Sequence, residues 1–101
     1  MEDRIQNSDV LAVKFEADWC QPCKVLNTHF EKMKDEFKNI EYLSVDVDEN
    51  PILTKKYDIK AVPSVILFNK GQEQKRIIGL VKISALRNTF REFLDEVKND
   101  G

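Results

Sequence analysis

The stretch Val-Leu-Ala-Val-Lys-Phe-Glu-Ala-Asp-Trp-Cys-Gln-Pro-Cys-Lys, residues 10–24, contains two cysteines shortly after a nearly continuous apolar run. The run at 10–15 is typical of a strand that is buried on both faces, as in a parallel sheet. Apolar residues then recur at steps of three and four over 21–38, which indicates an amphipathic helix. Cys20 and Cys23 therefore lie where a buried strand passes into a helix.

A cysteine at the start of a helix is well placed to react. Unpaired N–H groups and the helix dipole stabilise an anion there, so we expect Cys20 to supply a thiolate, the nucleophilic form of the side chain. Cys23 follows three residues later, on the same face of the first turn, and Pro22 is tolerated in that turn. The pair is therefore able to close a small ring and to reopen it.

The same Cys-x-x-Cys spacing occurs in zinc sites, so a metal site is an alternative. A closed tetrahedral zinc site needs four ligands, and the sequence has no second cysteine pair and a single histidine, His29. His29 flanks the apolar stripe of 21–38, and we interpret it as a residue at the boundary of the core. We expect no metal; metal or iron–sulfur binding shared by two copies stays as an alternative.

The remaining pattern predicts the rest of an α/β fold. We expect a short helix within 1–8 and then, in order, strand 40–47, helix 51–57, strand 64–68, strand 74–78 and helix 83–97. Alternation of strands and helices in the first half implies a parallel crossover, and the turn at 69–71, Asn-Lys-Gly, implies an antiparallel hairpin. The expected architecture is a four-stranded mixed sheet with helices on both faces, in one domain spanning 1–101.

The composition restricts the function classes. A chain of 101 residues that is 42% hydrophobic is large enough for one domain with its own core. Its net charge of -2, with both signs mixed along the chain, predicts no nucleic-acid or anionic-membrane partner. No apolar run reaches the roughly 20 residues of a membrane helix, and the polar start at 1–5 does not fit a signal peptide. We therefore expect a cytoplasmic protein whose cysteines are not a permanent structural disulfide.

Several separated motifs resemble the thioredoxin family over nearly the whole chain. The family's Trp-Cys-Gly-Pro-Cys-Lys pattern is matched, with Gln21 in place of glycine, by Trp19, Cys20, Pro22, Cys23 and Lys24. Its Asp-x-Asp-x-Asn-Pro stretch is matched by Asp46, Asp48, Asn50 and Pro51. Its Lys-Tyr-x-Ile-x-x-Val/Ile-Pro-Thr stretch is matched, with serine as the last residue, by Lys56, Tyr57, Ile59, Val62, Pro63 and Ser64. Two late glycines of the family are matched by Gly71 and Gly79.

The resemblance implies a thiol–disulfide oxidoreductase that reduces protein disulfides and is regenerated by a thioredoxin-reductase-type electron donor. Cys20 would attack a substrate disulfide and Cys23 would resolve the mixed disulfide. No bound cofactor is implied, because the electrons reside in the two sulfurs. Pro63 would be a cis proline beside the cysteines, with neighbouring backbone that pairs with the substrate like an added strand. Trp19 would cover the site, which Gln21, Pro22 and Val62 help to shape.

The chain departs from the family at Lys14, where the family has a buried acid six positions before the first cysteine. If Lys14 is charged, it would favour a thiolate on Cys23 electrostatically. If Lys14 is buried and neutral, it could accept the thiol proton of Cys23 directly. The simplest interpretation, however, is that the long stem of Lys14 carries its ammonium group to solvent. Glu16 shares a strand face with Lys14 and is a candidate to pair with it or to supply the missing carboxylate; Asp46 is another candidate partner.

The chain also begins closer to the cysteines than the family usually does, since 19 residues precede Cys20. We therefore expect one strand fewer and an exposed edge on strand 40–47. A monomer is expected, and pairing of two copies through that edge is the alternative. Gln21 alters the dipeptide that tunes redox poise, although we still expect a reducing protein. The alternative function is a thioredoxin-fold adaptor whose cysteines are not essential, which the short start, Lys14 and Glu16 favour.

Overall fold

The computed structural model describes residues 2–100 as four helices and four strands. The helices are α1 (Glu2–Asn7), α2 (Gln21–Glu36), α3 (Pro51–Lys56) and α4 (Ile83–Asp100). The strands are β1 (Val10–Glu16), β2 (Glu41–Asp46), β3 (Ser64–Asn69) and β4 (Gln72–Ile78). The predicted order of elements is confirmed, with ends that differ from the predicted ranges by a few residues.

The four strands form one mixed sheet in the order β2-β1-β3-β4. β1 pairs with β2 in parallel and with β3 antiparallel, and β3 pairs antiparallel with β4. The β3–β4 connection is a tight turn in which Lys70 and Gly71 both have positive φ, 52° and 82°, as a two-residue hairpin requires. The predicted four-stranded sheet is confirmed, and β2 and β4 are its two edge strands.

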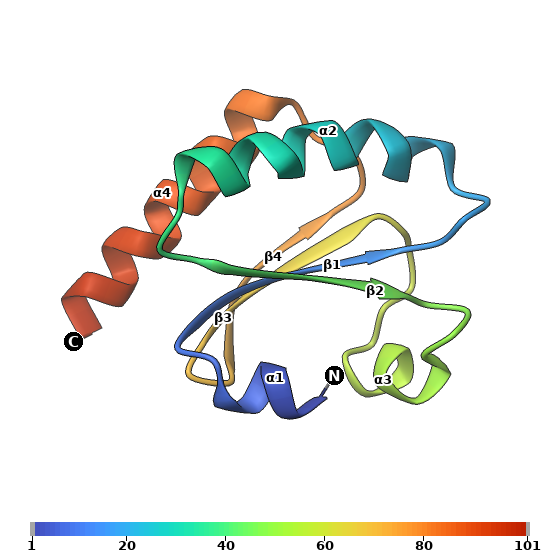
Figure 1. Cartoon of the computed structure of the whole chain (residues 1–101), viewed down its shortest axis with the longest axis horizontal. Helices are drawn as coiled ribbons and strands as arrows, with labels where there is room; N and C mark the ends of the chain where they lie inside the picture. Colours follow the sequence, from blue (N-terminus) through green and yellow to red (C-terminus); the bar gives the residue numbers. More distant parts are fainter. Residues whose placement is uncertain (1, 101) are drawn as a thin grey trace.

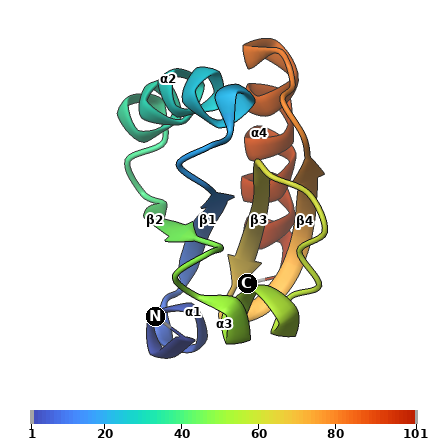
Figure 2. The same cartoon turned by 90° about the vertical axis from the view of Figure 1, so that its right-hand side faces the viewer.

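Helices cover both faces of the sheet (Figure 1 and Figure 2). α2 and α4 lie on one face, and α1 and α3 lie on the other. On the α2/α4 face the buried cluster includes Ala12, Leu26, Phe30, Met33, Val65, Leu67, Leu86, Phe90 and Phe93. On the other face it includes Ile5, Leu11, Val13, Phe15, Val45, Leu53, Ile66 and Phe68. β1 contributes side chains to both clusters, which explains why apolar residues occur on both faces of this strand.

Tyr42 joins β2 to the end of α2. Its hydroxyl oxygen lies 2.9 Å from the Met33 carbonyl oxygen and 2.8 Å from that of Phe37. Its ring packs edge-on against Phe30, with centroids 5.4 Å apart. Burial, and secondarily the charge of Glu36, raises the pKa of Tyr42 above its ordinary value. The hydroxyl therefore stays protonated and donates to the helix end.

We expect Tyr42→Phe to lower the free energy of unfolding by about 1 kcal/mol at neutral pH, because two carbonyl groups lose their donor. The folded pKa lies above the unfolded value of about 10, so this stabilisation is complete below about pH 10 and declines as the pH rises further. The variant lacks this hydroxyl and its pH-dependent contribution. The difference in free energy of unfolding between the natural protein and the variant should therefore become smaller at alkaline pH. Urea unfolding at neutral and alkaline pH measures this, and a constant gap would contradict it.

Candidate active site

Cys20 and Cys23 lie at the junction of β1 and α2, at one end of the sheet (Figure 1). Cys20 is the N-cap of α2, and its Sγ accepts a hydrogen bond from the backbone N–H of Cys23 at 3.2 Å. Pro22 lies in the first turn of the helix. The two sulfurs form a disulfide between Cα atoms 5.3 Å apart. The predicted placement of both cysteines at a helix start is confirmed.

The disulfide lies in a small apolar cluster. The exposed fractions of Cys20 and Cys23 are 3% and 2%, and both pack with Ala17 against Val47 and Val62. The peptide bond between Val62 and Pro63 is cis, as the resemblance implied. The backbone N–H of Gly79 donates to the Pro63 carbonyl oxygen at 2.8 Å, which joins the end of β4 to this segment. The segment around Pro63 thus borders the cysteines, whereas Gln21 is exposed at the start of α2.

Trp19 is exposed beside the cysteines, with 67% of its surface accessible, and is no part of the core. Its indole N–H donates to Oδ2 of Asp48 at 2.9 Å. One wall of a shallow pocket is the Trp19 ring, and the other residues that line it are Val47, Thr54, Ile59, Lys60, Ala61 and Val62. Sequence reasoning missed Asp48 as the partner of Trp19, although it belongs to a motif that the resemblance had marked.

Lys14 does not reach solvent, and the simplest interpretation of its sequence position is wrong. Its exposed fraction is 6%, because Asn27 and Phe30 of α2 lie over it. The Lys14 ammonium group donates to Oδ1 of Asn27, lies 3.2 Å from Oε1 of Glu16 and is 4.9 Å from the centroid of the Phe30 ring. Asn27 was missed by sequence reasoning, although its position one turn after Cys23 was a usable signal.

Glu16, rather than Asp46, is the acidic partner of Lys14. Oδ1 of Asp46 instead accepts the backbone N–H groups of Asp48 at 2.9 Å and Glu49 at 3.2 Å. Asp46 therefore organises the loop after β2. Of the two candidate carboxylates, the structure brings only Glu16 into an ion pair with Lys14.

Other side chains supply no metal site in the described part of the chain. Among residues 2–100, no group of three or more His, Cys, Asp or Glu side chains is placed to hold a metal ion. His29 is half-buried, at the edge of the core as expected, and its Nδ1 is buried without a hydrogen-bond partner in the structure. Within the same residues, no helix combines the length and the apolar character needed to cross a membrane.

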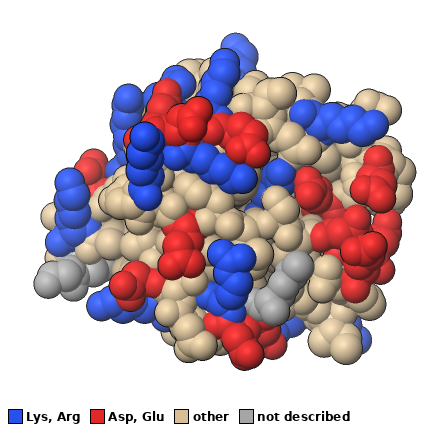
Figure 3. Space-filling view, in the orientation of Figure 1, with Lys and Arg blue, Asp and Glu red and all other residues tan. Residues whose placement is uncertain are grey.

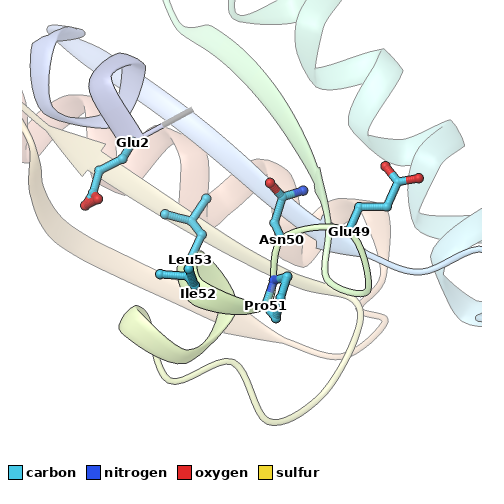
Figure 4. A pocket seen from close by; sticks show the side chains of 6 residues that line it. All are labelled: Glu2, Glu49, Asn50, Pro51, Ile52 and Leu53. Atoms are coloured by element: carbon cyan, nitrogen blue, oxygen red, sulfur yellow. The ribbon is translucent and has the colours of Figure 1, made fainter.

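A separate pocket lies between α1 and α3 and contains neither cysteine. Figure 4 shows the side chains that line it, Glu2, Glu49, Asn50, Pro51, Ile52 and Leu53. On the face of the molecule seen in Figure 3, acidic and basic side chains are interspersed. That face presents no extended basic surface of the kind that nucleic acids require.

Comparison with known proteins gives a consistent result. The sequence model of the family described as Thioredoxin matches residues 1–92. The chain is 35% identical to Thioredoxin H2 of Arabidopsis thaliana over 76% of its own length and 58% of that protein. It is 35% identical to a thioredoxin of Mycoplasma genitalium, over 77% of this chain and 76% of that protein. It resembles the oxidised structure of mitochondrial thioredoxin 3 from Saccharomyces cerevisiae, with a TM-score of 0.83 at 31% identity, covering 90% of this chain and 85% of that one.

Proposed function

The chain belongs to the thioredoxin family of thiol–disulfide oxidoreductases, and on this premise we propose that it reduces disulfide bonds in other proteins through Cys20 and Cys23. The observation that carries the proposal is the disulfide at the start of α2. The exposed Trp19 and the cis bond before Pro63 lie in the segments that surround it. Substrates of this class are proteins with an accessible disulfide.

Cys20 is the attacking thiolate in the proposed reaction. Its Sγ at the N-cap accepts the backbone N–H of Cys23, and N–H groups at a helix start stabilise a negative sulfur. The thiolate attacks one substrate sulfur, a Cys20–substrate bond forms, and the other substrate sulfur leaves as a thiol. Cys23 then attacks Cys20, which closes the Cys20–Cys23 disulfide and releases the second substrate thiol. Two electrons pass from the cysteine pair to the substrate.

The substrate segment is proposed to lie over the shallow pocket between Trp19 and Val62. The residues that line that pocket include the apolar side chains of Val47, Ile59 and Ala61. Val62 precedes Pro63 and packs next to the cysteines, and this supports the proposal that its main chain pairs with an extended peptide like an added strand. Such pairing uses backbone groups and is therefore compatible with many substrate sequences.

Each turnover leaves the protein oxidised, so a donor of two electrons must restore the dithiol. We propose a thioredoxin-reductase-type partner for this step and no bound cofactor, since the electrons are carried by sulfur. We further propose a single domain that acts as a monomer in the cytoplasm. A reducing compartment suits a cysteine pair that must be reopened in every cycle. Sedimentation at high concentration and fractionation of cells test the last two points.

Equilibration of the protein with dithiol buffers of graded potential tests the proposed function. We expect a two-electron transition near the thioredoxin value of about −270 mV. Thiol alkylation and the fluorescence of Trp19, next to the disulfide, monitor this transition. A value above roughly −200 mV would indicate an oxidase or isomerase instead. Absence of any two-electron transition would overturn the redox assignment and leave the adaptor.

A further inference from the structure

Lys14 carries a buried charge that the proposed reaction leaves unused. It lies on the α2/α4 face of β1, where the neighbouring position on that face is the fully buried Ala12. Burying an ammonium group is costly unless it is paired. The structure supplies one charged partner, Glu16, whose side chain is still 26% exposed, and one neutral partner, Asn27. The positive charge is therefore held in place by one ion pair and one hydrogen bond.

Each of the two partners of Lys14, Asn27 and Glu16, is close in sequence to a residue of the cysteine cluster. Asn27 lies four residues after Cys23 on α2, and side chains at that spacing are direct neighbours on one helix face, with Cβ atoms about 6 Å apart. Glu16 immediately precedes Ala17, which packs against both cysteines. The ammonium group of Lys14 is thus hydrogen-bonded to a residue that lies one helical turn after Cys23.

We infer that Lys14 is a positioning residue for the second half of the exchange, where its fixed positive charge favours the thiolate of Cys23. The inference rests on the proposed function. Cys23 is buried, and burial disfavours its charged form, whereas a nearby cation favours it. Cys23 gives its proton to water or buffer and then attacks Cys20. The Cys20–Cys23 bond forms, the Cys20–substrate bond breaks, and the substrate leaves as a thiolate that takes up a proton.

The other charges around Lys14 are few. On β1, the carboxylate of Glu16 opposes its effect. On α2, Lys34 lies 5.9 Å from the centroid of the Phe30 ring, which Lys14 also contacts, and Lys24 is exposed, where water and salt screen its charge. The register neighbours on β2 and β3 are Ser44 and Val65, and α4 contributes Leu86 and Phe90 to this core, all without charge. Asp46, beside Glu16 in the register, accepts backbone N–H groups.

Lys14→Met tests the inference because methionine keeps much of the stem and removes the charge. The reduced protein is mixed with a symmetrical chromogenic aromatic disulfide in a stopped-flow instrument. Release of the first aromatic thiol reports attack by Cys20, and release of the second reports resolution by Cys23. We expect the pH midpoint of the second phase to rise by on the order of one unit, a roughly tenfold slower resolution at pH below the midpoint. The pH midpoint of the first phase should shift by less than that of the second.

Glu16→Gln supplies the opposite prediction. Removal of the carboxylate leaves the charge of Lys14 uncompensated, so the midpoint of the second phase should fall and resolution at low pH should accelerate. Loss of packing would slow both variants and would not produce shifts of opposite sign. Lys32→Met is the matched control, because it removes one exposed positive charge from α2 and should leave both phases unchanged.

Two outcomes would overturn the inference. One is a second-phase pH profile of Lys14→Met that superimposes on that of the natural protein. The other is a raised midpoint in Glu16→Gln, which would make Glu16 the proton acceptor of Cys23. If urea titrations show that Lys14→Met is unfolded, the direction in which Glu16→Gln shifts the second-phase pH midpoint decides the inference alone. Failure of the natural protein to release the second thiol would instead contradict the proposed function.

Discussion

Cys20→Ser is expected to abolish disulfide reduction, with a loss of about 10³-fold or more in turnover. The serine hydroxyl is not ionised at neutral pH, and an oxygen at this position forms no disulfide with Cys23. The measurement is reduction of a protein disulfide by the variant, with a small dithiol as the terminal donor. The natural protein and a reaction with the dithiol alone provide the two reference rates.

The fold should survive this replacement, which makes the result interpretable. Serine is a favourable N-cap, so its Oγ takes over the hydrogen bond that Cys20 Sγ accepts from the N–H of Cys23. The urea midpoint should therefore match that of the reduced natural protein. A variant that keeps both its partner proteins and its cellular function would contradict the oxidoreductase assignment and establish the adaptor.

Cys23→Ser is expected to stop the reaction halfway. Cys20 still attacks the substrate, but nothing resolves the product, so the variant accumulates as a mixed disulfide with a yield near one substrate per chain. Turnover falls about as far as in Cys20→Ser because the second step is lost. Non-reducing electrophoresis and mass spectrometry detect the adduct, and addition of a dithiol should release it.

Cys20→Ser is the matched control for this trap, since it retains the other cysteine. We expect it to form little adduct, because Cys23 is at the third position of the turn rather than at the N-cap. An adduct that forms through Cys23 in Cys20→Ser, and not through Cys20 in Cys23→Ser, would reverse the two roles. Equal trapping by both variants would show that neither cysteine is the preferred nucleophile.

Much of the fold was predictable because the informative signals are local. The apolar run at 10–15 indicated a strand covered on both faces, and β1 is indeed central, between β2 and β3. Asn69-Lys70-Gly71 indicated a hairpin because glycine tolerates the positive φ that such a turn needs. The elements are consequently in the predicted order, and their ends differ by only a few residues.

The site was predictable to the same extent, and for the same reason. A cysteine pair directly after a buried strand and at the start of an amphipathic helix must lie at a helix N-terminus, and Cys20 is found at the N-cap. The cis bond before Pro63 was expected from the family resemblance alone, since nothing in the residues around it distinguishes a cis from a trans proline.

Periodicity places each side chain on a face of its own element, and in this chain it determined the sheet, its layers and the position of the cysteines. Contacts between elements were decided only by the tertiary structure. Lys14 was expected in solvent, yet α2 brings Asn27 and Phe30 over it and buries the charge. Trp19 likewise meets Asp48 from the loop after β2. The physical reason is that the surroundings of a side chain depend on how two elements pack, and no repeat within either element records that arrangement.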